Sequence, residues 1–205
     1  MHRQPLIELL HAYAARYPEE RATTERFLDF VCRNRRCFDR DLWEGHVTGS
    51  AWLVDAAEER VLLTHHRKLG RWMQLGGHSD GNPLPLRVAV QEAREESGLD
   101  VTPLSAQVFD LDVHAIPARR QDPEHLHFDV RFALRVVGSD AFRVSHESLD
   151  LAWVAVERLE DYTDEESVLR MARKWRRPGH GNFVSGPEDP GRDQPPSNAN
   201  RNSRP

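Results

Sequence analysis

The sequence is poor in several features that define whole classes of protein. It has two cysteines in 205 residues, too few for the disulfide framework of a small secreted protein, so a reducing, cytoplasmic location is expected. No apolar run approaches the roughly 18 residues that cross a membrane, and we expect no membrane partner. The first apolar patch contains Glu8 and His11, which is not the pattern of a secretory signal.

Positive charge is not in excess. Lysine and arginine number 28 against 33 aspartates and glutamates, which gives a formal net charge of −5. A protein that coats nucleic acid needs cations to neutralise phosphates, so stable nucleic-acid binding is not expected. The hydrophobic content of 39% supports a core of modest size, and the length predicts one domain with appendages.

The chain divides into three regions of different texture. Residues 1–45 place apolar side chains at helical spacing, which predicts a helical N-terminal extension that acts as a cap or as the surface of a homodimer. Residues 46–177 alternate strand-like runs with helical segments and predict an α/β domain. Residues 178–205 are rich in proline, glycine and polar side chains. Such a segment buries too little apolar surface to offset the entropy of ordering, so we predict a disordered tail.

One helix of the α/β domain has clear start and stop signals. Asn82 is a good N-cap, Pro83 suits the first helical position and Gly98 suits the left-handed position after the last turn. These signals predict a helix over residues 83–97. The apolar residues expected to pack this helix on the sheet are Leu86, Val90 and Ala93.

Three carboxylates crowd one face of this helix. At about 100° per residue, Glu92, Glu95 and Glu96 fall within an arc of roughly 100°. Like charges at this spacing repel, and a solvated acidic face would usually interleave lysine or arginine. The cluster becomes favourable when it holds a hard cation such as Mg²⁺, which prefers carboxylate oxygen and bridges to phosphates. A plain solvated acidic face is the alternative.

Residues 77–99 resemble the Nudix box. That pattern is Gly, five residues, Glu, seven residues, Arg-Glu, an apolar residue, any residue, Glu-Glu, any residue, Gly and an apolar residue. Seven of its nine fixed positions match without a gap, at Gly77, Glu92, Ala93, Glu95, Glu96, Gly98 and Leu99. Pro83 stands in the place of the first Glu, and Gln91 stands in the place of the Arg.

The resemblance implies an α/β fold of the α+β kind, a Nudix-type α/β/α sandwich with a mixed sheet. It also implies hydrolysis of a diphosphate linkage by metal-assisted attack of water. The expected substrate is a small nucleoside diphosphate derivative, such as a nucleotide sugar, ADP-ribose or a modified nucleoside triphosphate. The expected cofactor is Mg²⁺ or Mn²⁺.

The resemblance assigns roles to individual residues. Glu92, Glu95 and Glu96 are expected to bind the metal, with the Gly77 backbone as a further ligand, and Glu95 and Glu96 are counted as catalytic. Family members often carry another carboxylate in a loop before a late strand, as a base or extra ligand, and Glu147 fits this position. The next candidate is Asp150.

The two departures from the box motivate a second interpretation. Pro83 and Gln91 are expected to weaken metal affinity or turnover, because glutamine hydrogen-bonds without charge. The alternative is therefore a catalytically weak or inactive Nudix-like module that senses nucleotides. The three retained glutamates favour the enzyme.

Four residues outside the box are candidates for substrate binding. Arg67 and Arg71 precede the Gly-Gly turn and are placed to meet phosphates, although loops often expose such residues for no such reason. Trp72 adjoins the same turn and is placed to stack a base, with a core role as its alternative. His127 is a candidate pocket contact in a histidine-rich sequence, where each histidine alone is more often structural.

Overall fold

The computed structural model describes residues 2–119, 122–146 and 148–177. The predicted disordered tail lies outside the described residues. The elements, with η marking short 3₁₀ helices, are α1 (Gln4–Arg16), η1 (Pro18–Glu20), α2 (Arg21–Arg33), β1 (Gly45–Val54), β2 (Arg60–His66), β3 (Arg71–Met73), β4 (Leu75–His78), α3 (Pro85–Ser97), β5 (Val101–Pro103), β6 (Asp110–Ile116), β7 (His125–Val136), β8 (Ser148–Ala155), η2 (Val156–Asp161) and α4 (Glu166–Trp175).

The strands of the described chain form one mixed sheet. β1 and β7 lie parallel and pair along the whole of β1, from Gly45 opposite Leu126 to Val54 opposite Arg135. The other pairs are antiparallel: β4 and β2 pair with β1, β5 and β6 pair with β7, and β3 and β8 pair with β2. This mixed α+β architecture, with helices at the N-terminus, confirms the predicted fold class.

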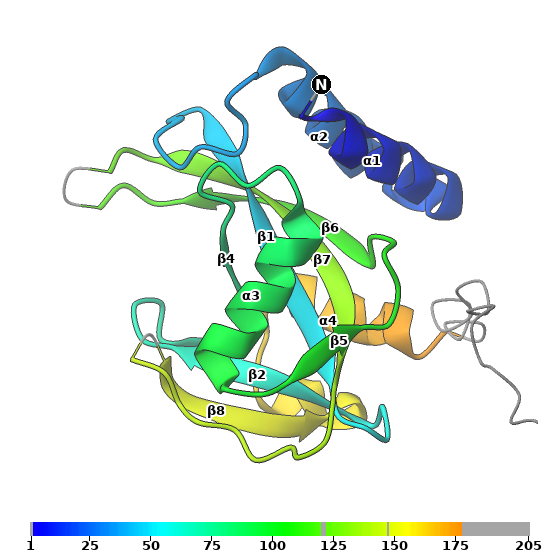
Figure 1. Ribbon diagram of the computed structural model, residues 1–205, viewed down its shortest axis with the longest axis vertical. Coiled ribbons are helices and arrows are strands. Elements are labelled where there is room, and N and C mark those ends of the chain that lie inside the picture. Colours follow the sequence, from blue (N-terminus) through cyan, green and yellow to red (C-terminus); the bar gives the residue numbers. More distant parts are fainter. Residues whose placement is uncertain (1, 120–121, 147, 178–205) are drawn as a thin grey trace, which may run out of the picture.

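Helices cover the sheet from several sides. Figure 1 shows α3 in front of β1 and α4 behind the sheet, with α1 and α2 side by side at the end near β6. Phe30 of α2 stacks on Phe128 of β7 with ring centroids 3.8 Å apart, and Phe27 meets the same ring edge-on. The apolar face of the N-terminal helices is therefore buried on the chain's own sheet, which fits the role of a cap. Within the described ranges, no helix combines the length and apolar character needed for a membrane crossing.

Helix α3 begins two residues later than predicted. Leu84 takes φ −118° and ψ 84° and Pro85 opens the helix, because the residue before a proline is disfavoured in the helical region. Asn82 is therefore not the N-cap; its Oδ1 accepts a hydrogen bond from the Leu84 amide at 3.1 Å, in the turn before the helix. Gly98 ends the helix with φ 69°, as predicted.

The face of α3 that packs on the sheet differs from the prediction by two residues. Ala93 is buried, as expected, but Leu86 and Val90 are only half-buried. Leu86 and Val90 still pack against the edge of the core, and Val88 and Ala89 are the more deeply buried residues of the helix. The later start of the helix does not change which residues share a face. The difference is therefore a rotation of the helix about its own axis where it packs on β1.

Candidate active site

Helix α3 packs beside strand β4 and brings its glutamates against the glycine pair Gly76-Gly77 of that strand. Glu96 is 7% exposed, and its Oε1 accepts a hydrogen bond from the Gly76 amide at 3.0 Å. Glu92 lies so close to Gly77 that a methyl group there would stand 2.5 Å from the Glu92 carboxyl carbon. Glu95 is exposed at the open side of the same face. The Gly76-Gly77 pair thus gives the helix carboxylates access to the strand backbone.

The three glutamates line one pocket of about 350 Å³. This volume is at the lower end of the range for small-molecule sites. The wall opposite α3 comes from β1, β2, β4, β6 and β7, and its other residues include Arg40, Thr48, Ser50, His66, Lys68, Met73, Gln74, Gly76, Gly77, His78, Asp80, His114, Ile116, His127 and Asp129. The predicted acidic cluster is therefore one wall of a polar pocket.

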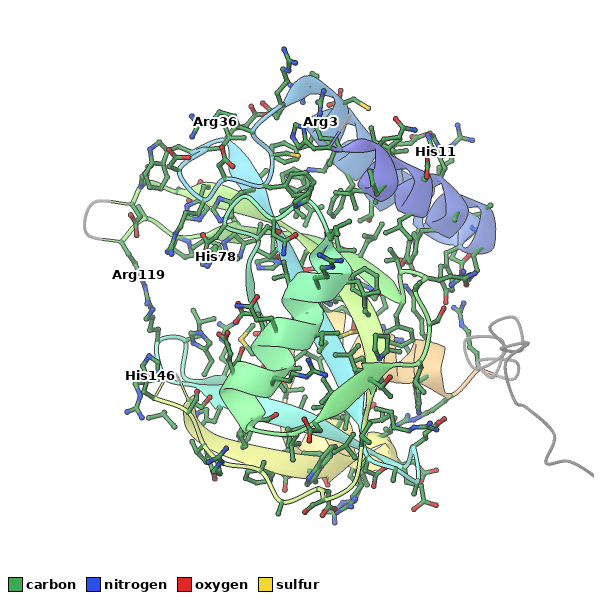
Figure 2. All side chains as sticks on the ribbon, viewed as in Figure 1. Arg3, His11, Arg36, His78, Arg119 and His146 are labelled. Atoms are coloured by element: carbon green, nitrogen blue, oxygen red, sulfur yellow. The ribbon has the colours of Figure 1, made fainter. Side chains whose placement is uncertain are left out.

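The β6–β7 hairpin reaches across toward the β2 side of the molecule. Arg119, which follows β6, donates a hydrogen bond from Nη2 to the Lys68 carbonyl at 2.8 Å. Figure 2 shows the Arg119 side chain extended from the hairpin toward the side that carries His146. Lys68 itself lines the pocket, so this hydrogen bond connects the β6–β7 hairpin to a residue of the pocket wall.

Asp129 organises the floor of the pocket. It is 2% exposed, and Oδ1 accepts hydrogen bonds from Thr48 at 2.8 Å and Ser50 at 2.7 Å. Its Oδ2 accepts from Gln74 at 3.3 Å and from Arg131 at 2.7 Å. Four donors therefore occupy this carboxylate, which ties β1, β7 and the start of β4 together.

Asp129 had no role in the expectations drawn from the sequence. The period-2 alternation of β7 places it on the same face as His127, and that alternation is the signal that could have found it. The neighbouring strand β1 supplies Thr48 and Ser50 at the same spacing, in register with Asp129 and Arg131.

Gln91, in the place of the arginine of the box, contacts the acidic cluster. Its Nε2 donates a hydrogen bond to Glu95 Oε1 at 2.9 Å, one turn along α3. A neutral amide thus orients Glu95 where the family pattern has a guanidinium. The interaction is exposed and its donor is neutral, so it contributes less than an ion pair with a guanidinium would.

The structure places Arg71 and Trp72 away from the glutamates. Arg71 pairs with Glu165, and Trp72 stacks on His65 with ring centroids 5.0 Å apart and 17° between the planes. Both line a separate hollow beside Tyr162. Successive side chains of a strand point to opposite faces, so β3 sends Trp72 to the face opposite Met73, which does line the glutamate pocket.

Arg67 is likewise outside the described lining of the glutamate pocket, whereas His127 lies in it. The guanidinium of Arg67 donates to the carbonyls of His146 at 3.0 Å and Ser148 at 2.7 Å. Its position is thus fixed by backbone at the start of β8, and the adjacent Lys68 is the basic residue of this loop that reaches the pocket.

The two carboxylates proposed for the late loop have different outcomes. Glu147 lies outside the described residues. Asp150 is exposed on β8, opposite His65, and accepts a hydrogen bond from the Leu151 amide at 2.8 Å. It is absent from the described lining of the pocket.

Two glycine-to-alanine changes should separate activity from stability. In Gly77→Ala the three atoms nearest the new methyl group all belong to the flexible carboxylate of Glu92, so we expect a folded protein that loses at least about 10-fold in turnover as Glu92 shifts. In Gly49→Ala the methyl group meets the Pro85 carbonyl oxygen at 2.5 Å and Val88 Cβ at 2.9 Å. That overpacking should cost about 1–3 kcal/mol of unfolding free energy.

Urea unfolding and turnover, measured on both glycine variants, check this expectation. A Gly77→Ala protein with unchanged turnover would show that the position of the Glu92 carboxylate does not matter. A Gly49→Ala protein as stable as wild type would contradict the close packing of α3 on β1.

Comparison with known proteins assigns the fold. Among solved structures, a MutT protein from Methanosarcina mazei Go1 superposes with a TM-score of 0.50 at 15% identity, over 66% of this chain and 99% of that one. A NUDIX-family hydrolase from Clostridium perfringens gives a TM-score of 0.48 at 24% identity, covering 63% and 95%. A Caenorhabditis elegans Ap4A hydrolase gives 0.45 at 16% identity, covering 63% and 93%. No curated protein matches the sequence.

The family model described as NUDIX domain matches residues 45–175, which is more than half of the chain. The match begins with β1 and ends with α4, and it includes the glutamate helix and the whole sheet. Helices α1 and α2 precede it. The chain belongs to the Nudix family.

Proposed function

We propose that this chain is a metal-dependent hydrolase that cleaves a diphosphate linkage in a nucleoside diphosphate derivative. The observation that carries the proposal is the convergence of Glu92, Glu95 and Glu96 on one pocket, against the bare backbone of Gly76 and Gly77. Membership of the Nudix family supports the reaction class.

The residues present fit Mg²⁺ or Mn²⁺. The donor set consists of carboxylate oxygens and a glycine backbone, the hard oxygen ligands that these ions prefer. The space that a side chain at Gly77 would fill is occupied by the Glu92 carboxylate. Glu92, Glu95 and Glu96 would hold the ion, with the Gly77 carbonyl as a further ligand. Bound there, it would neutralise the diphosphate and lower the pKa of a water molecule.

The remaining residues of the pocket position the substrate. Lys68 and Arg40 bring positive charge to a wall otherwise rich in carboxylates, which suits the phosphates. His127 is proposed to contact the substrate from the floor. Arg67, Arg71 and Trp72 stay proposals for groups that extend beyond the pocket, since Arg71 and Trp72 line the neighbouring hollow.

Asp129 is a poor candidate for the residue that activates the attacking water. The four donors on Asp129 occupy its two oxygens, so it holds the floor of the pocket and has little capacity left to accept a proton from water. Glu147 remains the candidate for this role, and Glu95 and Glu96 are the catalytic carboxylates of the helix.

A nucleotide-sensing module is the second candidate function. Gln91 favours it, because a neutral side chain orients Glu95 in the place of the arginine. Such a module would bind the same nucleotides in the same pocket without cleaving them.

A product screen distinguishes the two functions. Nucleotide sugars, ADP-ribose and modified nucleoside triphosphates are incubated with the protein and Mg²⁺ or Mn²⁺, and the products are separated by chromatography. Hydrolysis predicts two phosphorylated products from at least one compound. Binding of a compound, measured by calorimetry, with no product from any compound would overturn the enzyme and support the sensing module.

A further inference from the structure

A second group of potential metal ligands lies beside the glutamate pocket. The imidazole nitrogens of His46, His125 and His127 include one ligand atom from each ring, and these atoms all lie within 4.8 Å of one another. The parallel register of β1 and β7 sets His46 directly opposite His127, and His125 is two residues away on the same face. Two strands thus bring together residues that are about 80 positions apart in the sequence.

His46 and His125 are buried and His127 is half-buried, and several of the ring nitrogens have no partner among the described residues. His46 is 2% exposed, and neither of its ring nitrogens has a hydrogen-bond partner among the residues described. The buried Nε2 of His127 also lacks a partner within that part of the chain. A buried polar atom without a partner costs about 1–3 kcal/mol. A single cation would satisfy one nitrogen of His46 together with Nε2 of His127.

The orientation of His125 suits a ligand. Its Nδ1 donates to the Pro123 carbonyl at 2.8 Å, which leaves Nε2 as the nitrogen with a lone pair. A metal-binding histidine almost always donates its other nitrogen to a carbonyl or carboxylate in this way.

We propose that His46, His125 and His127 form a binding site for one zinc-class transition-metal ion, separate from the carboxylate site of the glutamates. Imidazole nitrogens select first-row ions such as Zn²⁺, whereas Mg²⁺ prefers oxygen. Ligands of tetrahedral zinc, at 2.0–2.1 Å from the metal, are about 3.3 Å apart. The cluster therefore needs to close by about 1.5 Å at most, which side-chain rotation supplies.

The site would adjoin the proposed active site. His127 lines the glutamate pocket, as does His78, whose ring lies 5.1 Å from those of both His46 and His127. A fourth imidazole thus packs beside the three proposed ligands, although it is not among the residues whose ligand atoms lie within 4.8 Å of one another. The competing explanation of the cluster is that the histidine rings simply pack against one another, as His46 and His125 do with ring centroids 4.9 Å apart.

Titration with metal alone tests the site. Untagged full-length protein, stripped of metal, is titrated with Co²⁺ and then with Zn²⁺. We expect one equivalent of Co²⁺ to give the intense visible bands of a four-coordinate ion, and Zn²⁺ to remove them. In His127→Gln and His125→Gln, the dissociation constant for Zn²⁺ should rise at least about 100-fold.

Two further variants show where the metal binds. The triple change of Glu92, Glu95 and Glu96 to Gln should leave the Co²⁺ bands intact, because those ligands belong to the other site. His11→Gln, on the exposed side of α1 (Figure 2), is the matched histidine control and should bind as wild type. Circular dichroism confirms that each variant is folded; His125→Gln serves should His127→Gln fail to fold.

Absence of a stoichiometric four-coordinate Co²⁺ spectrum would overturn the proposal. So would Zn²⁺ affinity unchanged in folded His127→Gln or His125→Gln protein, or bands that vanish in the triple glutamate variant. Any of these three results would leave ring packing as the role of the cluster.

Discussion

Glu96→Gln is expected to lower the kcat of diphosphate hydrolysis by at least about 100-fold. Glu96 is buried and lines the glutamate pocket, and its Oε1 accepts a hydrogen bond from the Gly76 amide, which holds the carboxylate in a fixed position. Glutamine keeps the shape but removes the charge that a divalent cation needs. Its amide oxygen can still accept the Gly76 hydrogen bond, but the amide nitrogen that replaces the other carboxylate oxygen cannot bind a cation. Turnover as a function of Mg²⁺ concentration is the measurement.

The matched control for this change is Glu166→Gln. Glu166 is an exposed residue of α4 that pairs with Arg173, outside the described lining of the glutamate pocket. Its replacement should leave kcat and the Mg²⁺ dependence unchanged. Equal kcat in wild-type and Glu96→Gln protein would remove Glu96 from the reaction.

Asp110→Ala is expected to lower the free energy of unfolding by about 3–5 kcal/mol. Asp110 is fully buried and accepts from three cations: Arg131 at 3.1 Å, Arg170 at 2.7 Å and Lys174 at 2.6 Å. Arg131 and Lys174 are themselves buried. Removing the shared anion takes one partner from each cation and leaves excess positive charge in a buried network, although Arg131 keeps Asp129 and Lys174 keeps Glu20.

The same network predicts a pH dependence. Burial alone would raise the pKa of Asp110, but the hydrogen bond from Arg170 and the charges of Arg131 and Lys174 outweigh it and lower the pKa. A carboxyl with a lowered folded-state pKa contributes stability above its unfolded pKa of about 4 and loses it as pH falls toward the folded value. The stability gap between wild type and Asp110→Ala should therefore narrow on acidification below about pH 4.

Urea unfolding at pH 7 and at pH 3 measures both effects. Asp29→Ala is the control, since Asp29 forms an exposed pair with Arg33 on one turn of α2, and its loss should leave the unfolding midpoint unchanged. An Asp110→Ala protein with the midpoint of wild type would show that the buried cations do not depend on Asp110.

The Nudix box, the shared face of its glutamates and the end of its helix could be predicted from the sequence, because each depends only on residues that are close together in the chain. The spacing of Glu92, Glu95 and Glu96 fixes their common helix face whatever surrounds them, and Gly98 ends the helix where its left-handed conformation is needed. The helix start was wrong because two signals competed. Pro83 suits a first turn, but Pro85 excludes the helical conformation at Leu84.

Non-local pairing accounts for what the sequence did not reveal. Alternation in β7 indicates that His125, His127 and Asp129 share a face, but it does not say which strand lies beside them. Only the register with β1 brings His46 and Thr48 to these residues. Similarly, the sequence does not distinguish Arg67 from Lys68, which are neighbouring basic residues of one loop. A hydrogen bond to a backbone carbonyl holds Arg67 outside the described pocket lining, whereas Lys68 lines the pocket.

The most direct test of the account is the metal dependence of hydrolysis in wild type and in the Glu95→Gln, Glu96→Gln double variant. Protein is treated with a chelator, Mg²⁺ or Mn²⁺ is added back stepwise, and product release from a nucleoside diphosphate derivative is followed. The account predicts no turnover without metal, full recovery in wild type and no recovery in the folded double variant. Hydrolysis by wild type that persists in the chelator, or equal recovery in both proteins, would contradict it.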